Sequence, residues 1–182
     1  MTQGISTTEA LEILKTTDPV QLLEILRRAT EAREKHSGDK IKTCSIVNAK
    51  CGNCQQNCAF CAQSARSKAK IHTYPLIPAE EMYNAAKDAA EHGSHRFGIV
   101  TSGTKVVQGH DLDEICKAIR MIRKDLPILP CASLGIMTED AMLQLKEAGL
   151  DRYHHNLEAS PSYFPEICTT RPYSSQLETV RT

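Results

Sequence analysis

The chain has 182 residues, 22 basic and 22 acidic side chains, and 41% hydrophobic residues. This length is near that of one domain, and the balanced charge excludes a strongly basic surface for nucleic acid. No apolar run approaches the roughly 18 residues of a membrane-spanning helix, and the N-terminus lacks a cationic stretch followed by an apolar one. We therefore expect a cytoplasmic globular protein with no membrane or nucleic-acid partner.

Residues 1–40 are expected to form a helical extension in front of the main domain, residues 41–182. Apolar residues recur at helical spacing over residues 7–36, and Pro19 separates two helices. Residues 41–48 are rich in β-branched side chains and predict the first strand. A cysteine-rich loop follows this strand.

From Pro78 onward, segments with strand and helix patterns alternate. Strands are predicted at 96–103, 127–135 and 150–158, and helices at 78–93, 110–126, 139–149 and from 172. Asp111 and Glu114 are expected to form a capping box, and Thr138 is expected to cap the next helix. A period of roughly 30 residues is typical of βαβ units in a parallel sheet. The pattern alone fits either a doubly wound sheet or the first four units of a (β/α)8 barrel, which needs about 250 residues.

The loop after the first strand carries the most distinctive chemistry. Cys54, Cys58 and Cys61 have the spacing C-x-x-x-C-x-x-C, and Cys51 lies three positions before Cys54. Thiolates this close together are soft metal ligands rather than parts of a disulfide framework. Zinc is an alternative, although its cysteine pairs usually lie about a dozen or more residues apart. The spacing favours a [4Fe–4S] cluster with three cysteine ligands and one open iron. A closed electron-transfer cluster with Cys51 as fourth ligand is a second alternative.

This loop, with Phe60 before its last cysteine, resembles the cluster loop of radical S-adenosylmethionine enzymes. The words SIVNAK, AQSARSKA, RYHHNLEAS and ICTTRPY narrow the resemblance to the biotin synthase family. It runs from about Ser45 to Arg181 and implies an α/β fold, the N-terminal half of a TIM barrel preceded by helices. It also implies three cofactors: a [4Fe–4S] cluster, S-adenosylmethionine, and an auxiliary cluster of the [2Fe–2S] or a variant type.

The resemblance implies a radical sulfurtransferase that converts dethiobiotin to biotin by inserting sulfur. The cluster would reduce S-adenosylmethionine to release a radical that removes hydrogen from unactivated carbon, so no acid or base side chain is expected to be catalytic. A flavodoxin or ferredoxin would supply electrons, and the full-length form would be a homodimer. The 182-residue chain alone is expected to be incomplete as an enzyme. The alternatives are a radical enzyme without sulfur insertion and a non-catalytic iron–sulfur or zinc fragment.

The resemblance also assigns residues that would bind S-adenosylmethionine, namely Phe60, Thr101, Ser102, Gly103, Asn156 and Glu158. Phe60 would lie beside the adenine, and Asn156 and Glu158 would hold the ribose. His154 and Asn156 are the implied substrate contacts. Strand alternation predicts that His154, Asn156 and Glu158 share one face, while His155 points away as a hydrogen-bonded barrel histidine.

One position departs from the family pattern. Gly98 stands where the family usually carries a cysteine that binds the auxiliary cluster, whereas Cys131 matches the next ligand of that cluster. Cys51 is a further candidate ligand that would replace the missing one. Arg171 also matches a family word, with surface charge as the alternative reading. The remaining cysteines are expected to be buried thiols, and these are Cys44, Cys116 and Cys168.

Overall fold

The structure is a computed structural model that describes residues 4–39, 41–106 and 109–182. By its internal contacts, the chain divides into two units, residues 1–41 and 42–182. Residue 40, which ends the predicted helical extension, lies outside the described residues. None of the described helices combines the length and the apolar character that crossing a membrane requires.

The first unit contains two helices, α1 (Thr7–Lys15) and α2 (Pro19–Ser37). The Ser6 side chain accepts a hydrogen bond from the Glu9 amide, and Asp18 accepts one from the Val20 amide, so each helix begins at a side-chain cap. Two helices separated at Pro19 are therefore confirmed. Neither helix contains a buried residue within this unit.

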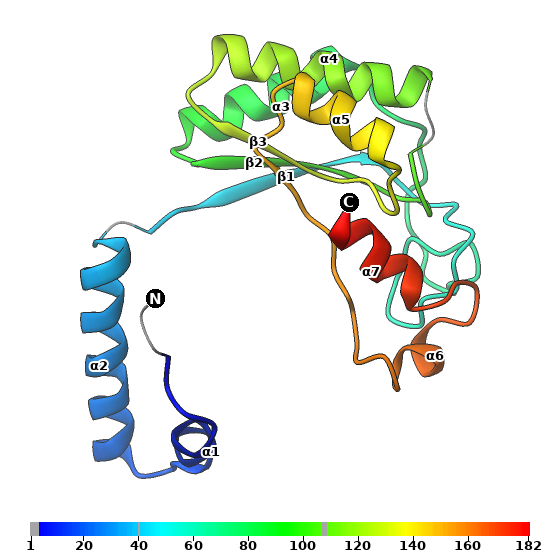
Figure 1. Ribbon diagram of the computed structural model, residues 1–182. Helices are drawn as coiled ribbons and strands as arrows, with labels where there is room; N and C mark the ends of the chain where they lie inside the picture. The colour runs from blue at the N-terminus through cyan, green and yellow to red at the C-terminus, as the bar shows by residue number, and fades with distance from the viewer. Residues whose placement is uncertain (1–3, 40, 107–108) are drawn as a thin grey trace. The chain divides into compact units, whose positions relative to one another are not determined.

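The second unit is built on a four-stranded sheet with the order β1-β2-β3-β4. All three strand pairs are parallel. The strands are β1 (Cys44–Lys50), β2 (Arg96–Thr101), β3 (Leu129–Ser133) and β4 (Arg152–Tyr153). The helices between them are α3 (Ala79–Glu91), α4 (His110–Asp125) and α5 (Glu139–Glu147), and they gather on one face of the sheet (Figure 1). Sequential parallel strands with helices on one side are the arrangement of a partial (β/α)8 barrel.

The hydrophobic core lies between the sheet and these helices. Phe97 and Ile99 of β2 are at most 1% exposed and point into this core. Because side chains alternate along a strand, Arg96, Gly98 and Val100 lie on the opposite face of the sheet. On that opposite face, Ile46 of β1 is 67% exposed. The sheet thus has one face covered by helices and one face that the described helices α3 to α5 leave open.

The predicted capping box of α4 is wrong, whereas the predicted Thr138 cap of α5 is confirmed. The N-cap of α4 is Gly109, and no side chain caps this helix. The Asp111 carboxylate instead accepts from Lys50 Nζ at 2.8 Å, and Glu114 accepts from the Ala79 amide at 2.9 Å. Both acids therefore connect α4 to neighbouring elements, which competes with local capping.

The fourth strand is much shorter than predicted. It contains only Arg152 and Tyr153, and the backbone then leaves the ladder, reaching a positive φ of 66° at Glu158. The chain continues into α6 (Phe164–Ile167), which the sequence did not predict, and α7 (Ser174–Arg181). The predicted sharing of one strand face by residues 154–158 is wrong, because it requires an extended strand over that segment.

Gly135, just after β3, lies in close contact with the backbone of Thr104, and substitution of this glycine tests that contact. It has φ +84°, and a Cβ atom added there would lie 2.3 Å from the Thr104 carbonyl oxygen. Gly93 also has positive φ, but no atom lies within 4 Å of its added Cβ. We expect Gly135→Ala to lower the free energy of unfolding by about 3 kcal/mol or more, and Gly93→Ala by about 1–2 kcal/mol. Urea denaturation of both variants measures this difference, and equal losses would contradict the tight contact with Thr104.

Candidate functional site

One cavity lies at the carboxyl ends of the parallel strands, where active sites of barrel enzymes gather. The cysteine loop, the ends of β2 and β3, and the segments after β4 all contribute to its wall. Its lining includes nine residues that the sequence predicted, namely Cys54, Cys58, Phe60, Cys61, Thr101, Ser102, Gly103, Asn156 and Glu158. The fold thus brings together side chains that are about a hundred positions apart in the sequence.

The three cysteines of the C-x-x-x-C-x-x-C motif sit on a loop closed by its own backbone. The Cys54 amide donates to the Gln63 carbonyl at 3.0 Å, and the Ala65 amide donates to the Cys54 carbonyl at 2.8 Å. Among the described residues, no three His, Cys, Asp or Glu side chains are grouped tightly enough for a single metal ion. A cubane places each thiolate on a different iron, so three thiols around one cavity still suit a cluster.

Residues 167–170, far along the chain, form hydrogen bonds to the cysteine loop. The Ala59 amide donates to the Ile167 carbonyl at 2.8 Å, and the Asn57 amide donates to Thr170 Oγ1 at 3.1 Å. The Asn57 side-chain oxygen in turn accepts from the Thr169 amide at 3.0 Å. Residues 167–170 belong to the word ICTTRPY, and here that word holds the cysteine loop in place.

The end of β2 holds the other side of the loop. The Ser102 amide donates to the Lys50 carbonyl at 2.9 Å, and the Ser102 hydroxyl donates to the Gly52 carbonyl at 2.7 Å. Ser102 is therefore both a lining residue of the cavity and a structural contact. Phe60, by contrast, is 61% exposed and lies at the rim.

Cys58 has a charged neighbour in the cavity wall. Arg171 Nη2 donates to the Cys58 sulfur at 3.7 Å. Burial raises the pKa of the Cys58 thiol to about 11, and the Arg171 cation opposes this rise. A free Cys58 therefore keeps its proton at neutral pH, so binding of a metal centre must release that proton.

The cavity wall also contains buried polar atoms without partners. In the part of the chain that the structure describes, four buried side-chain atoms make no hydrogen bond, and these are Thr101 Oγ1, His155 Nε2, Arg171 Nε and Gln176 Oε1. All four residues line this one cavity. A buried polar atom without a partner costs about 1–3 kcal/mol. The cavity is therefore suited to a ligand that offers both hydrogen-bond donors and acceptors, as the amino acid and ribose parts of S-adenosylmethionine do.

One prediction about the RYHHN segment needs correction, and one stays a prediction. The substrate contact implied for His154 stays a prediction; this residue is exposed outside the cavity lining, and its Nε2 lies 2.8 Å from Asn156 Oδ1. His155, which was expected to point away, lines the cavity instead. The irregular backbone after Tyr153 explains the place of His155, since strand alternation ends there. Sequence reasoning also gave no role to Gln176, and no motif around it could have indicated one.

Cys131 lies outside this cavity, on the open face of the sheet. Arg96 Nη1 donates to the Cys131 sulfur at 3.6 Å and also pairs with the Asp151 carboxylate. Gly98 is the register partner of Cys131, and a Cβ atom added to Gly98 would lie 3.1 Å from Ile46 Cγ2. The space beside Cys131 that a side chain at position 98 would use is thus partly filled by Ile46.

The other cysteines differ in their surroundings. Cys44 is exposed, so its predicted burial is wrong; it begins β1 on the open face, in register with Arg96. Cys51 is buried and donates to Gln63 Oε1 at 3.2 Å, and it does not line the cavity. The predicted burial of Cys116 and Cys168 is confirmed.

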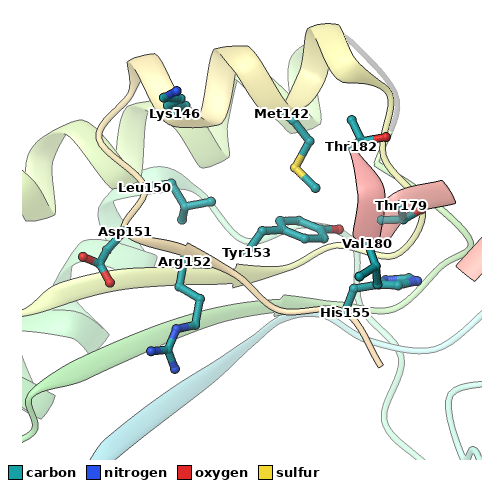
Figure 2. Close-up of a pocket in the computed structure, with 10 residues that line it drawn as sticks. All are labelled: Met142, Lys146, Leu150, Asp151, Arg152, Tyr153, His155, Thr179, Val180 and Thr182. Carbon is teal, nitrogen blue, oxygen red and sulfur yellow. The ribbon is translucent and has the colours of Figure 1, made fainter. Parts of the chain in front are cut away.

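A second cavity lies beside β4, and its lining comes from α5, β4 and α7 (Figure 2). Met142, Leu150 and Val180 give it an apolar part, and the ring of Tyr153 points into the same region. The Tyr153 hydroxyl donates to the Gly135 carbonyl at 2.6 Å. Among the strands that the structure describes, β4 pairs with β3 alone, so this cavity lies along the free edge of β4.

Residues 50–182 match the family described as the Radical SAM superfamily. The chain belongs to the radical SAM superfamily. The biotin synthase of Citrifermentans bemidjiense is 49% identical over 179 residues, 98% of this chain and 54% of that protein. The biotin synthase of Geotalea uraniireducens is 43% identical over the same shares. The chain thus spans about half the length of these curated relatives.

The crystal structure of methylornithine synthase shares this fold. It aligns with a TM-score of 0.81 and 16% identity, covering 99% of this chain and 52% of that one. The predicted α/β fold, a partial barrel of the radical SAM type, is confirmed. Membership of the superfamily implies a [4Fe–4S] cluster and S-adenosylmethionine as cofactors. The three loop thiols and the unpaired polar atoms of the cavity fit both groups.

His155 predicts a pH dependence of stability. Burial lowers the pKa of its imidazole below the ordinary value of about 6.5. The unfolded chain then binds the proton more tightly, so stability is full above that ordinary value and is lost as pH falls through the lower folded-state pKa. We expect His155→Gln to reduce the loss of unfolding free energy between about pH 7.5 and 5, measured by urea denaturation.

His92 provides a matched control with the opposite sign. Its pKa is raised by the Asp88 carbonyl and by the Asp88 carboxylate. Its contribution is therefore present at low pH and lost as pH rises through the folded-state pKa, so His92→Gln should steepen the loss of stability on acidification. An unchanged pH profile in His155→Gln would contradict the burial of the neutral imidazole.

Proposed function

We propose that the chain is part of a biotin synthase, a radical sulfurtransferase that forms biotin from dethiobiotin. One observation carries the proposal: the three cysteines of the family's cluster loop and, among the described residues, all four residues with an unpaired buried polar atom line the same cavity. The identity of 49% to the Citrifermentans bemidjiense relative supports the same reaction.

Cys54, Cys58 and Cys61 are the proposed ligands of the [4Fe–4S] cluster. Their sulfurs face a cavity in which one iron would stay open to a small ligand. The buried Cys51 thiol bonds to Gln63, which supports a structural role for it and weakens the closed four-cysteine alternative. Arg171 is the guanidinium of the cavity wall and a suitable partner for a ligand carboxylate.

The other lining residues would position S-adenosylmethionine. Thr101, Ser102 and Gly103 would face its methionyl part, and Phe60 at the rim would cover the adenine. Glu158 holds a positive φ of 66°, a strained backbone of the kind found at ligand sites, and its carboxylate would accept from the ribose hydroxyls.

Asn156 would bind ribose and substrate together. The contact between His154 and Asn156 Oδ1 supports a substrate role for His154 that acts through Asn156. When bound, the cluster and S-adenosylmethionine together supply the radical that removes hydrogen from unactivated carbon. The residues of this chain orient that cofactor and exclude water from it.

The sulfur donor is proposed to bind on the open face, next to Cys131. Arg96 Nη1 donates a hydrogen bond to the Cys131 sulfur, as a neighbour of a ligating sulfur can do. Glycine has no side chain to ligate an auxiliary cluster, so Gly98 cannot supply the second thiolate. The sequence predicts Cys51 as the replacement, but the Cys51 thiol is bonded to Gln63. Cys44 is exposed on the same face as Cys131, in register with Arg96, and is proposed in its place.

We also propose partners and a cellular compartment for the full-length protein. A flavodoxin or ferredoxin would reduce the cluster, and the full-length protein would be a homodimer. All eight cysteines are free, and thiols of this kind persist in the reducing cytoplasm.

A radical enzyme without sulfur insertion is a second candidate, and one observation favours it. Ile46 partly occupies the space where a ligand at position 98 would stand. In that case Cys131 would be a packed thiol, and the cavity with its cluster would still work as described.

A direct test joins this chain to the C-terminal half of the Citrifermentans bemidjiense relative. With dethiobiotin, S-adenosylmethionine and a reductant, the protein should form both 5′-deoxyadenosine and biotin. Glu158→Ala should lower 5′-deoxyadenosine formation on the order of tenfold or more, since one hydrogen bond to a charged group contributes about 1.5–3 kcal/mol. Chromatography of both products gives the readout.

Cys131→Ser separates the two candidates. Biotin synthase predicts that this variant still forms 5′-deoxyadenosine but no biotin. Unchanged biotin formation would remove Cys131 from the donor site. Formation of 5′-deoxyadenosine by the unsubstituted protein, with no biotin, would favour the enzyme without sulfur insertion.

A further inference from the structure

A buried glutamine of the cysteine loop joins three segments of the chain. Gln56 lies between Cys54 and Cys58, lines the cavity and is 9% exposed. Its Nε2 donates to Thr104 Oγ1 at 2.7 Å, and its Oε1 accepts from the Thr170 hydroxyl at 2.7 Å. One amide group thus bonds the cysteine loop to a residue that follows β2 and to a residue that precedes α7.

The main chain of Gln56 is held within the loop itself. The Ser64 hydroxyl donates to the Gln56 carbonyl at 2.6 Å, and Ser64 is buried. The Ser64 oxygen in turn accepts from the Arg66 amide at 3.1 Å. The Gln56 side chain therefore extends from a fixed part of the loop to its two threonine partners.

Each threonine adjoins a part of the cavity wall that has an unpaired polar atom. Thr104 follows the lining residues 101–103, and Thr101 Oγ1 is buried without a partner among the described residues. Thr170 precedes Arg171, whose Nε is likewise buried and unpaired there. Neither Thr104 nor Thr170 lines the cavity, so both stand behind the residues that would touch a ligand.

The separation of these two segments decides which ligand the cavity accepts. A ligand that pairs with both Thr101 and Arg171 must reach from the segment after β2 to the segment before α7. Groups that bind one ligand from distant segments need neighbours that fix their positions by hydrogen bonds. The Gln56 amide bonds both segments at once and therefore fixes their separation.

We propose that Gln56 is a positioning residue for S-adenosylmethionine, and that its amide holds the two segments at the separation that this cofactor requires. This inference rests on the proposed function, in which S-adenosylmethionine occupies the cavity. Gln56 acts through the segments that it joins, and it is not one of the proposed cluster ligands. Loss of its amide should therefore weaken cofactor binding while the cluster stays bound.

The test measures the affinity of the anaerobically reconstituted 182-residue protein for S-adenosylmethionine by equilibrium dialysis, with iron and sulfide content measured in parallel. Gln56→Leu removes both hydrogen bonds without adding a charge. We expect this variant to hold the cluster but to bind the cofactor on the order of tenfold more weakly, because two hydrogen bonds that fix the cavity wall are lost. Gln55→Leu is the matched control, since Gln55 is exposed and its Nε2 donates to the Asn53 carbonyl within the same loop. It should leave the affinity unchanged.

Variants of Thr104 separate positioning from packing. Thr104→Val keeps the shape of the side chain but removes the oxygen that accepts from Gln56, whereas Thr104→Ser keeps that oxygen. We expect Thr104→Val to weaken cofactor binding about threefold or more, and Thr104→Ser to restore most of that loss. Gln56→Leu combined with Thr104→Val should bind little more weakly than Gln56→Leu alone, because the shared hydrogen bond can be lost only once.

Three results would overturn the inference. The first is equal affinity in Gln56→Leu and Gln55→Leu, and the second is loss of the cluster in Gln56→Leu. The third is an equal loss of affinity in Thr104→Val and Thr104→Ser, which would indicate packing alone. If Gln56→Leu does not fold, the comparison of the two Thr104 variants decides.

The proposed function and the role of Gln56 fail separately. Wild-type protein that binds no cluster, or no S-adenosylmethionine, contradicts the proposed function itself. Wild-type protein that binds both, with an affinity that does not respond to Gln56, contradicts only the role of Gln56.

Discussion

The site depends on the hydrogen bonds that hold the cysteine loop between two distant segments. On one side, Ser102 binds the loop through its amide and hydroxyl. On the other side, the Ala59 amide binds the Ile167 carbonyl. Because these contacts join the ends of β2 and the region before α7 to the loop, the three thiols face one cavity before any cofactor arrives. Such preorganisation is what a cluster site needs from its protein.

The open face of the sheet carries the proposed sulfur-donor site. Side chains alternate along each strand, so Cys44, Gly98 and Cys131 lie on the face opposite the helices. The cavity begins where the same strands end, which places the proposed donor site on the barrel interior below the proposed cofactor site. Gly98 has no side chain, and Ile46 fills part of the space in which one would stand.

Much of this fold could be predicted from sequence, because long segments with clear periodicity leave few choices. The strands before α3, α4 and α5 and the helices themselves were predicted with errors of a few residues. The segment after Tyr153 could not be predicted, since its path is set by tertiary contacts such as that between Gln176 Nε2 and the Asn156 carbonyl. For the same reason, His155 lines the cavity, contrary to the prediction. The motif cysteines were found because their spacing is local, whereas the hydrogen bond between the Ala59 amide and the Ile167 carbonyl joins two distant segments that no local pattern pairs.

The central claim is that Cys54, Cys58 and Cys61 together bind one [4Fe–4S] cluster at this cavity. The most direct measurement is the iron and sulfide content of the anaerobically reconstituted protein and of each Cys→Ala variant, with Cys51→Ala as control. The account predicts about four iron and four sulfide ions in the wild-type site, loss of the cluster in each of the three motif variants, and retention in Cys51→Ala. Retention of the cluster after loss of any one motif cysteine, together with its loss in Cys51→Ala, would contradict the account.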